Sequence, residues 1–271
     1  MIDILIFSKN RAMQCEFCLR SLKENFNVEK SITVQYVYTN GIFKQGYDKL
    51  SATYKDVRFQ REMGFENTFK LFVNEFKNQY CLFLCDDDVV INRVEQNELN
   101  ELIKVYESNK DIHTLSLRMH EHVNMCFPAK MSIVPPVFIE KDEKHLLWDY
   151  TKSIPHYCWG YPFAIDGHIY KTEWFKNKLN TIHFHDVNDL EANLNCHRDN
   201  DKPLILSFNQ TKIFNIQNNF VQGKRQNERT YSVEDLNNRY LRGEKISTNG
   251  IYGIMLNHVH GNVGFTFQAG L

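Results

Sequence analysis

Short apolar runs alternate with amphipathic stretches through the first half of the chain. Runs of apolar, β-branched and aromatic residues predict strands at residues 2–7, 32–38 and 80–85, with a brief one at 57–60. Apolar side chains at steps of three and four residues predict helices at residues 15–26, 65–76 and 99–106. Because strands and helices alternate, the sequence predicts an α/β fold with a mostly parallel central sheet and right-handed crossovers.

The pattern is less regular in the second half of the chain. Residues 114–119 alternate and predict a strand, whereas periodicity fades between residues 120 and 144, where three prolines indicate a loop. Residues 156–170 gather aromatic side chains around glycines and an Asp-Gly pair, which predicts a strand or hairpin. The later elements expected are a helix from Trp174, a capped helix after Asp186, a strand at 213–221 and a helix at 233–242 that Ser232 opens.

Composition places the chain among globular proteins. It has 271 residues, of which 42% are apolar and 24% charged, and its formal net charge is -1. Nucleic-acid-binding proteins usually carry a basic surface, so this charge argues against that class. No apolar run approaches the roughly 18 residues of a membrane span, and the first residues lack a basic region and cleavage site of a signal peptide. We therefore expect a cytoplasmic protein without a transmembrane segment, whose seven cysteines are reduced.

Three carboxylates, Asp86-Asp87-Asp88, follow the apolar strand predicted at residues 80–85. Ligands of α/β sheets bind at the carboxyl ends of strands, and neighbouring carboxylates repel one another unless a cation or donor groups offset their charge. Mg²⁺ and Mn²⁺ prefer oxygen ligands and keep positions for substrate phosphates. The sequence therefore predicts a site for a divalent metal and a phosphorylated ligand; the alternative is a polar turn that happens to be acidic. His258 and His260 share one face of an extended segment and are candidates to complete a metal shell, or are surface histidines.

A polar loop at residues 8–11 follows the first predicted strand and precedes a helix. A cation and free backbone N–H groups at a helix start can hold phosphate, so Arg11 is either a phosphate ligand or a surface residue near a helix cap. The loop has no G-x-G-x-x-G and no G-x-x-x-x-G-K-[ST] pattern, which disfavours a dinucleotide fold and a P-loop. Asn67 lies off the aromatic face of the 65–76 helix and is a further candidate for ligand contact.

Candidates for chemistry in the second half lie in two segments. Trp159, Tyr161 and Asp166 belong to the aromatic and glycine-rich segment, where exposed rings could stack on a sugar or base and buried rings would belong to the core. Asp189 and Glu191 fall in the first turn of a predicted helix, where capping accounts for one acid and leaves a spare carboxylate for chemistry.

Four of these features, taken in chain order, resemble the GT-A glycosyltransferases, and among them small bacterial enzymes of glycosyltransferase family 2. The resemblance spans nearly the whole chain. The features are the first strand with residues 8–11, the strand that ends in Asp86-Asp87-Asp88, the segment 159–167, and the acidic Asp189-Leu190-Glu191.

The resemblance implies a fold and an activity. It implies one GT-A, Rossmann-like domain over residues 1–271, with a nucleotide-sugar-binding half at 1–119 and an acceptor-binding half with a C-terminal tail at 120–271. The activity would be metal-dependent transfer of a sugar from a nucleotide-sugar to the hydroxyl of a glycan or lipid-linked acceptor, in bacterial surface polysaccharide or glycan synthesis. A lipid-linked acceptor would bring the protein to the inner face of the membrane as a peripheral partner. Two alternatives stay open: a nucleotidyltransferase, whose usual Gly-rich loop is missing at residues 8–11, and a non-catalytic carbohydrate-binding protein.

The resemblance also implies a donor site. The D-x-D motif of the family holds Mn²⁺ or Mg²⁺ on the diphosphate of the nucleotide-sugar. Carried over, Asp86 would face the ribose or the metal and Asp88 would ligate the metal, which His258 or His260 would complete. The family's second-strand acid, which reads the base, is replaced here by Thr39-Asn40. The other donor-binding residues would be Ser8, Asn10, Arg11, Asn40, Asn67 and Asp87.

The acceptor side would carry the catalytic base. In an inverting reaction, which we expect, a carboxylate removes the proton of the acceptor hydroxyl. Glu191 is the expected base, with Asp189 as its substitute or orienting partner; a retaining reaction would need no such base, and Glu191 would then bind acceptor. Trp159, Tyr161 and Asp166 would contact the acceptor.

Overall fold

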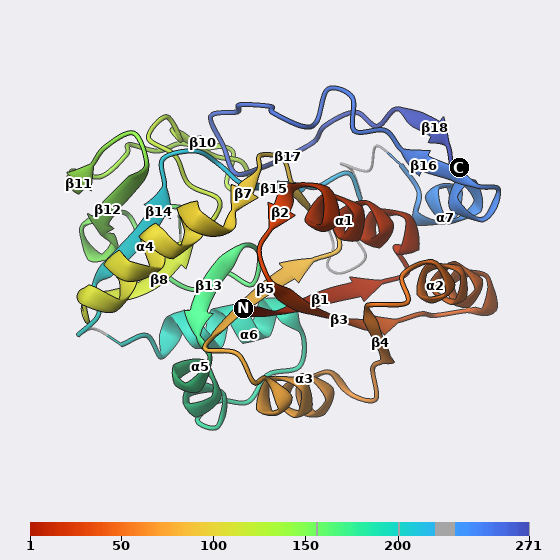
Figure 1. The fold of residues 1–271 in the computed structure, drawn as a ribbon, viewed down its shortest axis with the longest axis horizontal. Helices are drawn as coiled ribbons and strands as arrows, with labels where there is room; N and C mark the ends of the chain where they lie inside the picture. The colour runs from red at the N-terminus through yellow and green to blue at the C-terminus, as the bar shows by residue number, and fades with distance from the viewer. Residues whose placement is uncertain (156, 200, 220–230, 271) are drawn as a thin grey trace.

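One large mixed sheet forms the centre of the computed structural model, which describes residues 1–155, 157–199, 201–219 and 231–270 (Figure 1). Its strands are β1 (Ile2–Lys9), β3 (Lys30–Val37), β4 (Arg58–Arg61), β5 (Tyr80–Cys85), β8 (Ile112–Ser116), β11 (Phe138–Lys141), β12 (His145–Asp149), β13 (His168–Lys171) and β14 (Leu204–Phe208). Within the described residues these nine strands lie in the order β11-β12-β14-β8-β13-β5-β1-β3-β4.

The sheet is parallel at one edge and mixed elsewhere. β4, β3, β1 and β5 pair in parallel, and so do β8 and β14. β13 runs antiparallel to both of its neighbours, β5 and β8, and β11 and β12 form an antiparallel edge next to β14. The predicted α/β fold with a helix-flanked central sheet is confirmed. The sheet is less parallel than predicted because the second half of the chain contributes the antiparallel strands.

Helices cover both faces of the sheet (Figure 1). They are α1 (Ala12–Asn25), α2 (Gly41–Thr53), α3 (Phe65–Glu75), α4 (Gln96–Ser108), α5 (Thr172–Leu179), α6 (Val187–Cys196) and α7 (Val233–Leu241). Successive side chains of β1 enter two different cores. Ile4 and Ile6 pack in the core that holds α1, α2, α4 and α7, whereas Leu5 and Phe7 pack in the core that holds α3, α5 and α6. β1 is thus buried on both faces, as its apolar sequence predicts.

Short strands connect the C-terminal part of the chain to the end of β5. β6 (Asp88–Val90), β15 (Ile213–Ile216) and β17 (His260–Gly261) form a three-stranded sheet in which Asn215 pairs with both Asp88 and His260. Residues far apart in the sequence therefore meet at the acidic turn. The other short elements are the pairs β2 (Phe26–Asn27) with β7 (Val94–Glu95), β9 (Met125–Cys126) with β10 (Met131–Ser132), and β16 (Glu244–Ile246) with β18 (Phe267–Ala269), and the 3₁₀ helix η1 (Tyr150–Lys152).

The structure differs from the sequence prediction in two segments of the second half. Residues 157–167 form a loop instead of a hairpin, and β13 begins only at His168; His156, part of that prediction, lies outside the described residues. The strand expected at 213–221 ends at Ile216, and residues 220–221 also lie outside the described residues. Helices α6 and α7 begin where predicted, because Asp186 and Ser232 accept hydrogen bonds from backbone N–H groups of the first turn.

The central sheet takes strands from both predicted halves of the chain, 1–119 and 120–271. The assignment of donor and acceptor roles to these halves stays a prediction. Within the described ranges, every helix falls short of the length and apolar character that crossing a bilayer requires.

Candidate active site

A cleft of about 1190 Å³ opens at the carboxyl ends of β1, β3 and β5, the edge at which ligands of α/β sheets bind. Its lining includes Ser8 and Arg11 from the loop after β1, and Asp87 from the turn after β5. It also includes Tyr161 from the loop before β13 and Glu191 from α6. The cleft therefore joins the acidic turn to the predicted catalytic segment.

A buried network around Asp86 holds the acidic turn in place. Asp86 is fully buried, and its carboxylate accepts hydrogen bonds from the hydroxyl of Ser8 at 2.7 Å and from the backbone N–H of Lys9 at 3.3 Å. Its other oxygen pairs with Arg11. Burial raises the pKa of Asp86 to about 6, against the opposing effect of Arg11. The hydroxyl of Tyr47 on α2 lies 2.6 Å from that of Ser8 and fixes this side of the network.

Asp87 and Asp88 point in different directions. Asp87 lines the cleft, where one oxygen lies 2.8 Å from Nη1 of Arg11 and the other accepts from the amide of Asn215 at 3.0 Å. Asp88 is only 1% exposed and turns inward, accepting from the backbone N–H of Cys85 at 2.7 Å and from the same Asn215 amide at 2.8 Å. Burial raises the pKa of Asp88 well above its ordinary value. Of the three aspartates, Asp87 alone belongs to the described cleft lining, and the assignment of Asp86 and Asp88 as metal ligands stays a prediction.

The cleft lining also contains a second ionic cluster. Arg118, which follows β8, pairs with Asp166, and its Nη2 lies 2.6 Å from Nε2 of His260. The same ring nitrogen lies 3.0 Å from Asp166. Arg118 opposes the effect of burial and keeps the pKa of Asp166 below its ordinary value. His260 and Asp166 therefore lie in the cleft, as the sequence suggested, but each is already engaged with Arg118.

Glu191 combines a structural contact with access to the cleft. One carboxylate oxygen accepts the backbone N–H of Ile165 at 2.7 Å, which fixes the loop before β13 to α6. The hydroxyl of Tyr161 favours the charged form of this carboxylate and so opposes the rise of its pKa. Desolvation in the cleft wall, followed by the negative charge of Asp166, raises the pKa of Glu191 to about 8. A carboxyl group in such a setting is suited to proton transfer near neutral pH.

Asp189 serves the local structure of α6. Its backbone N–H donates to the capping carboxylate of Asp186 at 2.9 Å. Its own carboxylate accepts from the backbone N–H of His185 at 2.9 Å and from the amide of Asn193 at 3.0 Å. It is not part of the described lining of the cleft. The geometry therefore favours Glu191 over Asp189 as the group that meets a substrate.

Three predicted donor-site asparagines lie away from the described cleft lining. Asn10 has a positive φ of 58° and joins the loop after β1 to Thr39 through two hydrogen bonds of 2.9 and 3.0 Å. Asn40 caps α2 by accepting the backbone N–H groups of the first turn. Asn67 is exposed on α3. The physical reason for the difference is that the first two side chains satisfy backbone groups at element ends.

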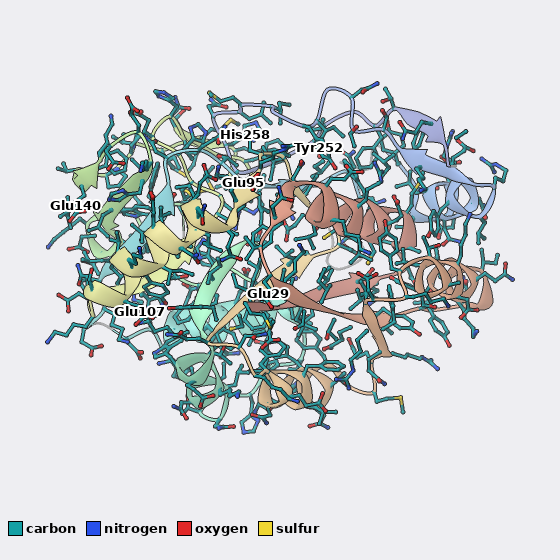
Figure 2. All side chains as sticks on the ribbon, in the orientation of Figure 1. Glu29, Glu95, Glu107, Glu140, Tyr252 and His258 are labelled. Atoms are coloured by element: carbon teal, nitrogen blue, oxygen red, sulfur yellow. The ribbon has the colours of Figure 1, made fainter. Side chains whose placement is uncertain are left out.

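Trp159 and His258 also lie outside the described cleft lining. Trp159 is 2% exposed, and its indole N–H donates to the carbonyl of Val123 at 3.0 Å inside a core cluster with Trp148. It therefore belongs to the core, the alternative that the sequence left open. His258 lies in the C-terminal segment that crosses the top of the molecule (Figure 2), with its ring between Phe127 and Phe214, and is absent from the described cleft lining.

The donor set suits a cation that is shared with a phosphorylated ligand. In the part of the chain that the structure describes, no three His, Cys, Asp or Glu side chains are arranged to hold a metal ion. Divalent cations such as Mg²⁺ are often bound by one or two carboxylates together with substrate phosphates, and Asp87 is placed to be such a ligand. Five described carboxyl groups lie close to two guanidinium groups here, and burial raises the pKa values of three of them, Asp86, Asp88 and Glu191.

The sequence reasoning missed several polar residues of this site. Arg118 and Asn215 organise the two ionic clusters, and Gln35 and Glu62 line the cleft beyond β1. The available signals were Asn215, a lone polar side chain in the apolar run of β15, and Arg118, a charged side chain in the alternating segment 114–119. A polar residue inside such a run is expensive to bury unless it has a partner.

Gly167 leaves room for the side chain of Arg118, and a substitution there tests the position of Arg118 in the cluster with Asp166 and His260. Its φ is +85°, and a Cβ atom there would lie 2.9 Å from Cγ of Arg118. We expect Gly167→Ala to lower the free energy of unfolding by about 1–3 kcal/mol, measured by urea denaturation. Gly250→Ala is the matched control, because its φ is +75° but nothing lies within 4 Å of the added atom. Equal losses in the two variants would contradict a role for the Arg118 contact.

Comparison with known proteins identifies the fold. No family model matches the sequence. A bifunctional glycosyltransferase of Dictyostelium discoideum, pgtA, is 24% identical over 196 residues, which are 67% of this chain. The chain spans only about a quarter of the length of that curated relative, 25%.

The solved structures include a glycosyltransferase fold of similar arrangement. The structure of S. aureus TarS 1-349 in complex with UDP matches with a TM-score of 0.51 and 14% sequence identity. The match covers 78% of this chain and 59% of that chain. At this identity the likeness concerns the fold alone. The fold of this chain is that of the GT-A glycosyltransferases.

Proposed function

We propose that this protein is a glycosyltransferase that moves a sugar from a nucleotide-sugar to the hydroxyl group of an acceptor. The observation that carries the proposal is the single cleft that joins Arg11 and Asp87 at the ends of β1 and β5 to Glu191 on α6. The proposal is supported by the fold, by the glycosyltransferase that is similar in sequence, and by the UDP that the structural neighbour binds.

The donor diphosphate would lie at the acidic turn. Arg11 would contact it from the start of α1, where free N–H groups also favour phosphate. We propose that Asp87 holds a Mn²⁺ or Mg²⁺ ion whose other ligands include phosphate oxygens. When bound, such an ion supplies positive charge that stabilises the departing nucleoside diphosphate. The position of Asp87 supports this cation, because its carboxylate lines the cleft and would repel a diphosphate unless a cation lay between them.

The acceptor hydroxyl would lie at Glu191. In the inverting reaction that we propose, the carboxylate of Glu191 takes the hydroxyl proton while the oxygen attacks the anomeric carbon. The hydrogen bond from Ile165 and the contact with Tyr161 hold this carboxylate in place. Tyr161 also lines the cleft and would contact the acceptor. Three calls stay predictions: the acceptor class (glycan or lipid-linked), a role in surface polysaccharide synthesis, and a location at the inner membrane face. None of the contacts described above favours a nucleotidyltransferase or a non-catalytic carbohydrate-binding protein.

Ligand-induced stabilisation provides the first test. We expect a nucleoside diphosphate or nucleotide-sugar to raise the melting temperature in the presence of Mn²⁺, and to do so less in the presence of a chelator. A ligand at a hundred times its Kd stabilises the folded state by about 2.7 kcal/mol, which corresponds to a shift of several degrees. Transfer is then measured as release of the nucleoside diphosphate with saccharide acceptors. Absence of both binding and release over the full panel of nucleotide-sugars would overturn the proposed function.

A further inference from the structure

We propose that Cys126 and Cys158 form a modification site inside the cleft, where a peroxide oxidises the two thiols to a reversible disulfide. Both cysteines are free in the structure. The inference goes beyond the proposed function, because the disulfide is defined by its own chemistry, and only its effect on sugar transfer rests on that function. In a protein whose cysteines are expected to be reduced, a disulfide is usually transient and redox-sensing.

Both cysteines belong to the wall of the cleft. Cys126 ends β9, Cys158 lies in the loop before β13, and both line the cleft. Both also pack in the hydrophobic cluster that contains Trp159. Cys126 is 5% exposed and Cys158 is partly buried. A small oxidant that enters the cleft therefore meets two thiols from segments that are far apart in the sequence.

Hydrogen bonds between neighbouring residues hold these two segments together. The pairing of β9 with β10 places Cys126 opposite Met131. Trp159 follows Cys158 directly, and its indole N–H donates to the carbonyl of Val123 at 3.0 Å. Val123 lies in the segment that leads into β9. The loop before β13 is therefore tied to the backbone that carries Cys126.

The surroundings favour the thiolate form of Cys126. The thiol of Cys158 has the largest effect and lowers the pKa of Cys126; backbone groups at Ala129 and Cys158 and the positive charge of Arg118 lower it further, against the effect of burial. The pKa of Cys158 is raised instead, by the neighbouring Cys126 and by burial. Effects of this kind require two groups close together. The pair therefore supplies an attacking thiolate and a neighbouring thiol that can resolve its oxidised form.

Oxidation by hydrogen peroxide takes two steps. The thiolate of Cys126 attacks one peroxide oxygen, the O–O bond breaks and hydroxide leaves, so that the sulfur loses two electrons and becomes a sulfenic acid. The thiol of Cys158 then attacks this sulfur, an S–S bond forms, and the hydroxyl group leaves with the thiol proton as water. The hydroxide of the first step takes up the proton that Cys126 lost on ionising. Two thiols and one peroxide thus give one disulfide and two waters, and a dithiol such as dithiothreitol reduces the disulfide again.

The disulfide would alter the part of the cleft that contains Glu191. Its sulfur atoms must lie about 2.05 Å apart, which draws the loop before β13 toward β9. The same loop carries Tyr161 in the cleft lining and Ile165, whose backbone N–H donates to Glu191 at 2.7 Å. A displacement of about 1 Å at a reacting group can lower a rate by about 100-fold. We therefore expect oxidation to lower turnover by at least about tenfold.

The test treats the reduced full chain with hydrogen peroxide, blocks the remaining thiols with iodoacetamide and maps the peptides by mass spectrometry. We expect two peptides joined through Cys126 and Cys158, lighter by two hydrogen atoms than the reduced pair and separated again by dithiothreitol. Turnover should fall as this pair forms and recover with the reductant. Cys158→Ser should leave Cys126 as a sulfenic acid that dimedone traps. Cys196→Ser is the matched control: Cys196 lines the same cleft at the end of α6 and is exposed, so its loss should leave the disulfide intact.

The outcomes separate this inference from the proposed function. A disulfide between Cys126 and Cys158 supports the modification site even if no transfer is found. Its absence at a peroxide concentration that oxidises Cys196, or a linkage that joins only Cys15 and Cys18 of α1, would overturn the site. An equal loss of turnover on oxidation in Cys126→Ser would overturn its effect on transfer. Thermal unfolding shows whether each variant folds, and the linkage itself is mapped in the unaltered chain, so the result for the site does not depend on a variant.

Discussion

Glu191→Gln is expected to lower the turnover number by about 10²- to 10⁴-fold, the range that loss of a general base produces. The substitution is conservative for the structure, because the glutamine oxygen can still accept the hydrogen bond that Ile165 donates to Glu191. It removes the group that can take a proton from the acceptor hydroxyl. Turnover is measured as nucleoside diphosphate release from the donor that the thermal-shift panel selects.

The role of Glu191 as the base also predicts how activity changes with pH. A base acts only when it is deprotonated, and the pKa of Glu191 is raised to about 8. The specificity constant kcat/KM should therefore rise with pH up to about 8 and level off above it, and this limb should disappear in Glu191→Gln. Asp189→Asn is the matched control: it alters only contacts at the start of α6, so turnover should stay near that of the unaltered protein while stability falls by about 1 kcal/mol. Full activity of Glu191→Gln would exclude Glu191 as the base.

The elements that could be predicted from the sequence are those whose local pattern matches their environment in the fold. β1, apart from the buried Asp3 and Ser8 and its terminal Lys9, and β5 are made of apolar and aromatic residues because both of their faces are covered, and α6 and α7 begin at side chains that cap them. Helix α2 was missed, although Phe43, Tyr47 and Leu50 are buried at helical spacing. Its two glycines obscure the pattern, and Gly46 is needed because an added Cβ would lie 2.8 Å from Cβ of Ala12 on α1. That requirement comes from helix packing, which the local sequence does not show.

The sequence could predict only those contacts of the site that join residues at the ends of adjacent parallel strands. Arg11 and the aspartates follow β1 and β5, which pair in parallel, so their proximity follows from the α/β pattern. The choice between Asp87 and Asp88 depends on the turn into β6 and on Asn215, which arrives through the pairing of β15 with β6. The contact between Arg118 and His260 likewise depends on strand pairing between distant segments, here β15 with β17. Such contacts have no local pattern, so sequence reasoning could propose the candidates but not their arrangement.

Asp87→Asn is the other variant with a large expected effect. It keeps the side-chain shape and the contact with Asn215 but removes the negative charge that faces the cleft. If Asp87 holds the cation, binding of the nucleoside diphosphate should lose its dependence on Mn²⁺. Turnover should then fall by at least about 100-fold, since a bound metal ion contributes several kcal/mol of charge stabilisation in the transition state.

Asp88→Asn distinguishes this assignment from the sequence prediction, which placed the metal on Asp86 and Asp88. Asp88 is buried, its pKa is raised well above the ordinary value, and both of its oxygens accept hydrogen bonds within the protein. An asparagine there would turn an amino group toward one of those donors, so Asp88→Asn should lower the melting temperature. In the fraction that remains folded, the Mn²⁺ dependence of nucleotide binding should persist, because the carboxylate that faces the cleft is intact. The reverse pattern, with Mn²⁺ dependence lost in Asp88→Asn and retained in Asp87→Asn, would place the cation at the buried carboxylate and require the turn after β5 to open when the donor binds.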